Sequence, residues 1–127
     1  MRFFKVFYMV LVVAMLAACG ERDAKDVALD YENALIKGDV DKIISMLDMN
    51  DEDKKHKQEL KGKLAYMVGG IPAQVEQKGG VDKIEVENEN CDDTYCMVNL
   101  KIYFNDGSSK NDRVKLKKVD GTWKISR

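Results

Sequence analysis

The chain is 127 residues long, which suits a single domain with one modest hydrophobic core. Charged residues make up 34% of it, but 21 basic and 22 acidic side chains almost cancel, so the formal charge is −1. A nucleic-acid-binding domain is expected to be clearly basic, and this balance therefore argues against nucleic acid as a partner.

The first 18 residues have the features of a secretory signal peptide. Arg2 and Lys5 give the chain a positive start, and an apolar run over residues 6–16 follows. This run is shorter than the roughly 20 apolar residues of a stable membrane-spanning helix, so a cleaved leader is the better interpretation. Cleavage removes 18 of the 127 residues and two positive charges, which leaves 109 residues with a formal charge of −3.

The leader ends in Leu16-Ala17-Ala18-Cys19. This motif resembles the bacterial lipobox, in which an aliphatic residue and two small residues precede a cysteine that is acylated before cleavage. The resemblance implies that Cys19 is the lipidated N-terminus and that residues 19–23 link it to a domain over residues 24–127. Several acyl chains hold a protein on a membrane for practical purposes permanently. The alternative is ordinary cleavage, which would leave Cys19 as a free thiol.

The lipobox also implies an address in the cell envelope, with the membrane as a partner through the lipid anchor. In such lipoproteins of bacteria with two membranes, an Asp directly after the cysteine tends to retain the protein at the inner membrane. Gly20 occupies that position here, which favours the outer membrane.

The other two cysteines, Cys91 and Cys96, enclose four turn-type residues between two strand-like segments. In an oxidising compartment this spacing favours a disulfide at a hairpin tip. A redox or metal-binding pair is the alternative. It is less favoured because the Cys-x-x-Cys spacing is absent and no His or third Cys lies nearby.

Apolar residues at intervals of three or four predict two helices at the start of the domain. The first begins at Ala24, and Lys37 and Gly38 supply its basic last turn and its stop. Asp39 is placed to cap the second. The two buried stripes are Val27, Ala28, Tyr31, Ala34 and Leu35, then Val40, Ile43, Ile44 and Leu47.

A third helix is predicted from Asn50 or Asp51, with acids in its first turn where the helix dipole favours them. No apolar residue precedes its stripe, so residues 51–59 are expected to be solvated and mobile. The glycine pairs Gly69-Gly70 and Gly79-Gly80 end this helix and the helical half of the domain. The stripe comprises Leu60, Leu64, Met67, Val68 and Ile71.

After Gly80 the apolar period changes to two, which predicts four antiparallel strands. Asp120-Gly121 predicts a two-residue hairpin turn that places Leu116 opposite Ile125. The inward residues of the four strands are Ile84 and Val86; Cys96, Val98, Leu100, Ile102 and Phe104; Val114 and Leu116; and Trp123 and Ile125.

The first hairpin needs an irregularity. If Cys91 faces Cys96 in a regular ladder, Val86 lies opposite Lys101, and the apolar residues of the two strands face opposite sides. A β-bulge near Asn88 or Asn90 would shift the register by one residue and restore a common apolar face. Otherwise the disulfide prediction is wrong.

Helices followed by antiparallel strands predict an α+β fold, with the helices packed on one face of a curved sheet of about four strands. Two stretches then suggest a family: Ala28-x-x-Tyr31-x-x-Ala34-Leu35-x-x-Gly38-Asp39-x-x-Lys42 and Asp120-Gly121-x-Trp123-Lys124-Ile125. They resemble the small cystatin-like or nuclear-transport-factor-like lipoprotein domains of bacteria, many of them of unknown function. The resemblance implies a cone-shaped fold that ketosteroid-isomerase-like enzymes share with many binding modules. No position matches a catalytic motif of those enzymes, so we assign no catalytic residue and expect no cofactor.

Three kinds of side chain are candidates for chemistry. His56 would make a base, but it stands among three lysines on a solvated turn, where a surface role is more common. Tyr31 would aim a hydroxyl into a cleft, although a core tyrosine is more common. A soft-metal site is not expected, because the methionines are scattered over different elements: Met46, Met49, Met67 and Met97.

Five cations alternate with apolar residues in the last three strands and should project from the face opposite the core. They are Lys101, Arg113, Lys115, Lys117 and Lys124. Such a face suits anionic lipid headgroups or an acidic partner. Lysines also protect sheet edges from aggregation, which is the simpler explanation.

These features favour a lipid-anchored binding or interaction module, in the periplasm or at the cell surface, for a protein or a small apolar ligand. A small ketosteroid-isomerase-like enzyme is the first alternative, and a deep cleft holding Tyr31 with an acid of raised pKa would favour it. An inhibitor or immunity lipoprotein that neutralises an envelope-active toxin is the second.

Overall fold

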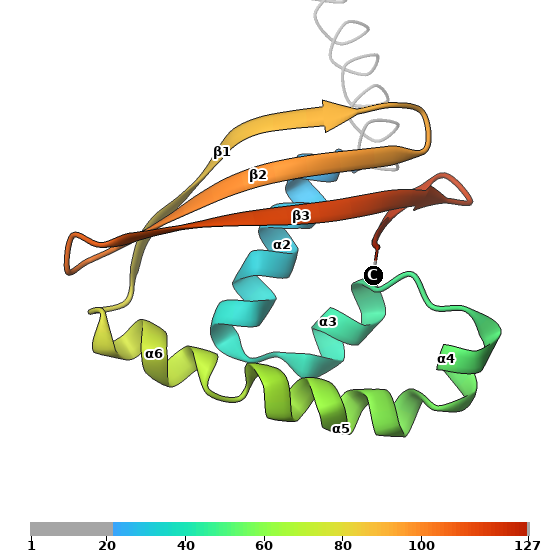
Figure 1. Ribbon diagram of the computed structural model, residues 1–127, viewed down its shortest axis with the longest axis horizontal. Helices are drawn as coiled ribbons and strands as arrows, with labels where there is room; N and C mark the ends of the chain where they lie inside the picture. Colours follow the sequence, from blue (N-terminus) through green and yellow to red (C-terminus); the bar gives the residue numbers. More distant parts are fainter. Residues whose placement is uncertain (1–21, 127) are drawn as a thin grey trace, which may run out of the picture.

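The computed structural model describes residues 22–126, so the leader, the lipobox and Cys19 lie outside the described residues. Helices come first and strands follow (Figure 1). The helices are α2 (Ala24–Lys37), α3 (Val40–Met46), α4 (Asp51–Lys55), α5 (Lys57–Val68) and α6 (Ile71–Gln77); the strands are β1 (Val81–Cys91), β2 (Tyr95–Phe104), β3 (Ser109–Val119) and β4 (Thr122–Ile125). The predicted α+β fold is confirmed.

None of the described helices combines the length and the apolar character needed to cross a membrane.

The junction between α2 and α3 forms as the sequence predicts. Gly38 adopts φ +67° and ends α2, and its backbone N–H donates to the carbonyl of Leu35 at 3.1 Å. The Asp39 carboxylate then accepts a hydrogen bond from the backbone N–H of Lys42 at 3.2 Å and caps α3. The chain therefore reverses direction within two residues.

The single third helix that the sequence predicts is wrong, because the chain breaks at His56 into α4 and α5. Asn50 and Asp53 close a capping box on α4, and no residue of α4 is buried, as the expected solvation of this segment requires. Met67 does not belong to the buried stripe, since 72% of it is exposed. Only the line through Leu60, Leu64 and Val68 faces α3, and Met67 is turned about 100° away from Val68.

The four strands form one antiparallel sheet in the order β1-β2-β3-β4. Val119 pairs with Thr122 and Leu116 with Ile125, as predicted for the Asp120-Gly121 hairpin. The predicted bulge is also confirmed: Cys91 pairs with Cys96, but the register shifts between Val86 and Asn88. As a result Val86 faces Leu100 on the inner face of the sheet.

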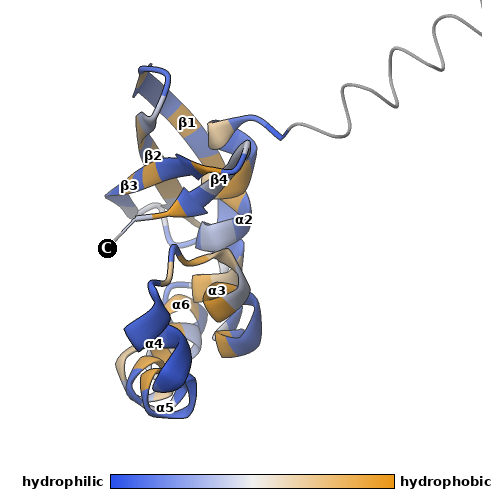
Figure 2. Ribbon diagram, turned by 90° about the vertical axis from the view of Figure 1, so that its right-hand side faces the viewer, coloured by the Kyte–Doolittle hydropathy of each residue, from blue (hydrophilic) through white to orange (hydrophobic). Residues whose placement is uncertain are grey.

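The core lies between the inner face of the sheet and helices α2 and α3. Figure 2 shows hydrophobic bands on the sheet and a hydrophilic α4 away from it. The same view shows that α2 begins beside the sheet, at the end away from α4 and α5. The most deeply buried large side chains are Ile43, Leu100, Leu116 and Val98, with Cys96.

Candidate functional site

The polar centre of the site is Glu32, which lies on the buried stripe of α2. Only 2% of this residue is exposed, and its Oε1 atom has no hydrogen-bond partner within residues 22–126. A buried carboxyl oxygen without a partner costs about 1–3 kcal/mol in stability. In native proteins such an atom often marks a place where a bound group completes the hydrogen bonding.

Asp112 and Lys110 of β3 supply the charges around Glu32. They share the inward-facing register of Val114 and Leu116, so the strand directs both side chains toward the helices. Burial, a hydrogen bond with the Asp112 side chain and the negative charge of Asp112 together raise the pKa of Glu32 to about 9, against a small opposing effect of Lys110. At neutral pH Glu32 is therefore protonated.

The protonation state determines what the free oxygen can do. Since Oε1 has no partner, the hydrogen bond to Asp112 runs through Oε2, which carries the proton and donates it. Oε1 is then a carbonyl-type oxygen that only accepts hydrogen bonds. Glu32 thus has one buried hydrogen-bond acceptor that the described residues leave without a donor.

A small cavity of ≈ 80 Å³ adjoins Glu32 between α2, α6 and the inner face of the sheet. Its wall is mainly apolar, and its polar edge is formed by Glu32, Asp112, Lys110 and Gln74. Lys78 borders the cavity too, with its ammonium 4.7 Å from the centre of the Phe104 ring. The apolar lining residues are Leu35, Ile36, Ile71, Val75, Ile102 and Phe104.

Tyr31 does not line this cavity, although it packs against the core next to Glu32 in the sequence. Burial raises the pKa of its hydroxyl, and the charges of Glu32 and Asp112 raise it further. The structure thus contains an acid of raised pKa but does not combine it with Tyr31 in a deep cleft.

Sequence reasoning missed Glu32, Asp112 and Lys110, although two signals were present. Glu32 lies four residues after Ala28 and three before Leu35, so it is an acid inside an apolar stripe. Lys110 and Asp112 extend the alternation of Val114 and Leu116 inward. If the apolar spacing pattern is extended to polar residues at the same inward positions, it identifies Glu32, Lys110 and Asp112.

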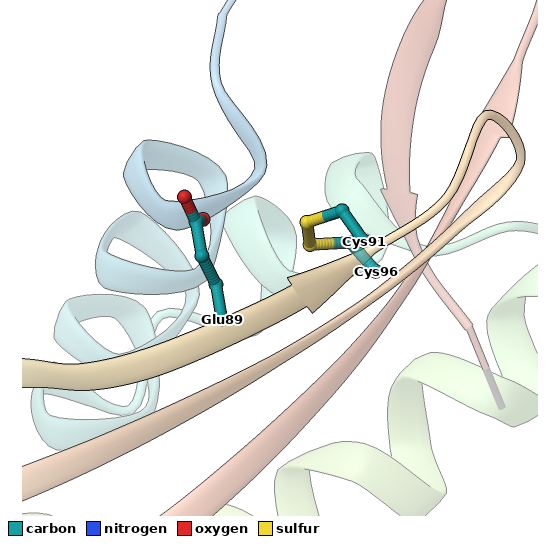
Figure 3. A group of neighbouring side chains, drawn as sticks. All are labelled: Glu89, Cys91 and Cys96. Carbon is teal, nitrogen blue, oxygen red and sulfur yellow. A yellow bond between two sulfur atoms is a disulfide. The ribbon is translucent and has the colours of Figure 1, made fainter.

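The predicted disulfide joins Cys91 and Cys96 across the β1–β2 hairpin. Glu89 projects on the same side, and its carboxylate lies within 4.8 Å of the sulfur atoms (Figure 3). Because the two sulfurs are bonded to each other, they are not thiolates that could bind a metal ion with Glu89. A short loop of this kind contributes about 2 kcal/mol in the chain-entropy model.

Four of the five predicted cations, Lys101, Arg113, Lys115 and Lys117, lie on the outer face of the sheet, whereas the ammonium of Lys124 reaches α3. Met97 pairs with Lys115, Asn99 with Arg113 and Lys101 with Asn111, all directed away from the core. Lys124 pairs with Lys117 at the β4 edge, and its Nζ atom donates to the carbonyl of Ser45 at 3.4 Å. Their role in binding stays a prediction.

His56 lies at the break between α4 and α5, where it fits the expected surface role. Its Nε2 atom is 3.1 Å from the Glu52 carboxylate, and its Nδ1 atom is 3.8 Å from that of Glu59. Its side chain is half exposed and does not line the Glu32 cavity.

The chain is similar to known proteins in fold and family. The family model described as "Domain of unknown function (DUF4878)" matches residues 17–126. A crystal structure from Campylobacter jejuni, named as a candidate NTF2-like transpeptidase, is 23% identical with a TM-score of 0.73, over 84% of this chain and 99% of that one.

Two designed proteins are more distant. A de novo designed protein with a curved β-sheet is 13% identical, with a TM-score of 0.47, over 81% of this chain and 93% of its own. A de novo designed NTF2-fold protein is 12% identical, with the same TM-score of 0.47, over 84% and 86%. No curated protein matches the chain. The structural likeness shows an NTF2-like fold, and from the family match we conclude that this chain belongs to the DUF4878 family of domains of unknown function.

Proposed function

We propose that the protein is a lipid-anchored binding module of the bacterial envelope, and that the Glu32 cavity receives a short apolar group bearing an uncharged hydrogen-bond donor. The anchor rests on the lipobox-like Leu16-Ala17-Ala18-Cys19. The binding site rests on one observation, the unpartnered Oε1 atom of the buried Glu32.

The dimensions of the cavity limit what can enter. Binding sites for drug-sized ligands usually measure about 300–1,000 Å³, whereas this one measures ≈ 80 Å³. Only a short chain of a few heavy atoms fits between Leu35, Ile71 and Phe104. The group is therefore a small ligand or the end of a larger one.

The charges around the cavity favour a neutral donor. Beside a protonated Glu32, the negative charge of Asp112 is already opposed by Lys110. An ammonium group would lose its hydration in an apolar space without a full counter-charge, and a carboxylate would face the oxygen of Glu32 and the charge of Asp112. An amide or a hydroxyl donates to Oε1 without either cost.

A series of four-carbon probes tests this site. Butyramide, butylammonium and butyrate share a propyl chain and differ in the polar group. With the full chain in neutral detergent at pH 7, we expect butyramide to shift the NMR methyl signals of Leu35, Ile71 and Ile102 at lower concentration than the two charged probes.

Two substitutions at one position separate the acceptor from the shape of the pocket. Glu32→Gln keeps a carbonyl oxygen and should keep butyramide binding, whereas Glu32→Leu removes the acceptor and should weaken binding about tenfold, equivalent to one lost hydrogen bond of roughly 1.4 kcal/mol. Equal binding by both variants, or tighter binding of butyrate, would show that Glu32 does not select the ligand.

The anchor is tested independently of the cavity. Mass analysis of the N-terminal peptide of cell-purified protein should show Cys19 as the first residue with acyl chains attached. The Cys19→Ala variant should leave the membrane fraction. An intact residue 1, or an unmodified thiol at Cys19, would contradict the anchor and leave the ligand site untouched.

A small enzyme with acid–base chemistry is the second candidate, and the raised pKa of Glu32 beside Asp112 favours it. A general acid or base in this cavity should accelerate solvent deuterium exchange at the α-carbons of butan-2-one. Glu32→Gln should abolish the acceleration. The same exchange rate with and without protein would remove this candidate.

A further inference from the structure

The outer face of the sheet is basic in a chain whose overall formal charge is −1. The outward positions of β2, β3 and β4 alternate with the buried ones and contain no Asp or Glu. They contain five cations, Lys101, Arg113, Lys115, Lys117 and Lys124. Lys101 lies opposite Glu85 of β1 and interacts with its charge, and the Lys124 ammonium donates to the Ser45 carbonyl of α3. Among the described residues Arg113, Lys115 and Lys117 form no ion pair, so the positive charge of this face is concentrated on β3.

Arg113 is held in position at the centre of this face. Its Nε atom donates to the Asn99 side chain at 3.2 Å, and the Asn99 amide donates to the Asn88 side chain at 2.5 Å. This row crosses three strands and borders a hollow of ≈ 530 Å³ in the sheet surface. The Nε contact fixes the guanidinium plane and leaves its terminal N–H groups for a carboxylate, which Arg binds in a two-point geometry.

Aromatic rings accompany the cations. Tyr95 is 43% exposed, and the Lys115 ammonium lies 5.7 Å from the centre of its ring. The Lys101 ammonium lies 5.3 Å from the ring of Tyr103. Partly exposed tyrosines among cations are typical of protein interfaces, because one side chain offers both apolar area and a hydroxyl.

We propose that the outer face of β2–β4 binds an acidic segment of another protein, with one carboxylate on Arg113 and its neighbours on Lys101, Lys115 and Lys117. Charge complementarity carries this choice. Glu87 of β1 and Asp112 of β3 also border the hollow, so the segment should extend from Arg113 along β3 toward Lys115 and Lys117.

A bilayer surface is less suited to this face, because Arg113 borders a hollow of ≈ 530 Å³ that a narrow peptide segment can enter and a flat lipid surface cannot.

Fluorescein-labelled hexaglutamate is the probe, and hexaglutamine is its neutral control. Anisotropy is measured with the full chain in neutral detergent at low salt. Lys115→Glu/Lys117→Glu should weaken hexaglutamate binding about tenfold or more, because it places acids where the peptide binds. Lys25→Glu/Lys63→Glu changes the net charge equally on exposed helical positions and should leave binding within about twofold. Arg113→Lys should weaken it about threefold, since lysine keeps the charge without the planar fork.

Thermal unfolding of each variant verifies that the domain is intact. Equal weakening by the two double variants would reduce the effect to net charge and overturn the proposal. The proposal also fails if hexaglutamate does not bind. If vesicles of mixed anionic and neutral phospholipid then bind, and the Lys115→Glu/Lys117→Glu variant loses this binding, the face binds lipid instead of an acidic peptide. An unmodified Cys19 would remove the anchor but leave the peptide measurements standing.

Discussion

Glu32 is the residue at which burial and ionisation oppose each other. Its pKa is about 9 in the folded protein and near 4.5 when the side chain is solvated. Between these two values the folded state holds a proton that the unfolded chain has released. The unfolded state therefore binds fewer protons, and the free energy of unfolding falls as pH rises from about 4.5 to about 9.

Replacing Glu32 by Gln should remove this pH dependence. Below pH 4.5 the wild-type Glu32 is protonated in both the folded and the unfolded state. The variant and the wild type should therefore not differ there in any stability that comes from proton uptake at residue 32. At pH 7 the variant should be more stable by about 1–3 kcal/mol, because the wild type pays for taking up a proton on folding. Chemical denaturation at pH 4.5, 7 and 8.5 measures the difference.

Glu76→Gln is the matched control, since Glu76 is exposed on α6 and loses a charge in the same way. Its stability relative to the wild type should change little over this range. A Glu32→Gln variant whose stability runs parallel to the wild type from pH 4.5 to 8.5 would show that Glu32 is ionised in the folded protein.

At the scale of elements, the junction between α2 and α3 depends on one glycine. Gly38 has φ +67°, and a Cβ atom there would lie 3.1 Å from the Cγ atom of Pro72 in α6. The position therefore restricts both the backbone and the packing of α6 against α2. The helix stop at Lys37-Gly38 in the sequence predicts the backbone restriction, but it does not predict the packing against Pro72.

Gly38→Ala should destabilise the protein by about 1–2 kcal/mol, because alanine is strained at positive φ and its methyl group presses on Pro72. Gly62→Ala is the internal control with the opposite sign. Gly62 is exposed inside α5, and outside its own helical turn no atom lies within 4 Å of its Cβ position, so alanine should stabilise by about 0.5–1 kcal/mol. Urea denaturation measures the change in the free energy of unfolding for both variants. A change of the same sign in both would contradict the geometry assigned to Gly38 and Gly62.

Strand pairing was the part of the fold most open to prediction at this scale. The conflict between a regular Cys91–Cys96 ladder and the apolar residues Ile84 and Val86 left two possibilities, a bulge near Asn88 or Asn90 or no disulfide, and the structure shows a register shift between Val86 and Asn88. The helical half was less predictable. A run of polar residues gives no period, so the break at His56 and the exposure of Met67 were not evident from spacing.

At the scale of the whole molecule, stability should be uneven. The β2 strand is buried at every second residue and paired on both sides, whereas α4 buries no residue and α5 packs only along one line. Local opening is cheapest where few apolar contacts must be broken. The two halves of the domain therefore differ in the free energy of local opening.

Hydrogen exchange measured by mass spectrometry should follow this order. Amides of residues 51–66 should exchange first and those of Val98–Ile102 last, with protection in β2 approaching that of global unfolding. Similar protection in α4 and β2 would mean that the helical layer is held by contacts other than those described.

The sequence by itself determined the α+β architecture and the β3–β4 register, and it predicted the disulfide and the outward cations Lys101, Arg113, Lys115 and Lys117, because each follows from a local period or a short spacing. The tertiary structure alone decided that Glu32 of α2 meets Asp112 and Lys110 of β3 beside an apolar cavity. These residues are some 80 positions apart in the chain. Only packing α2 on the sheet brings them together, removes water from them and raises the pKa of the acid.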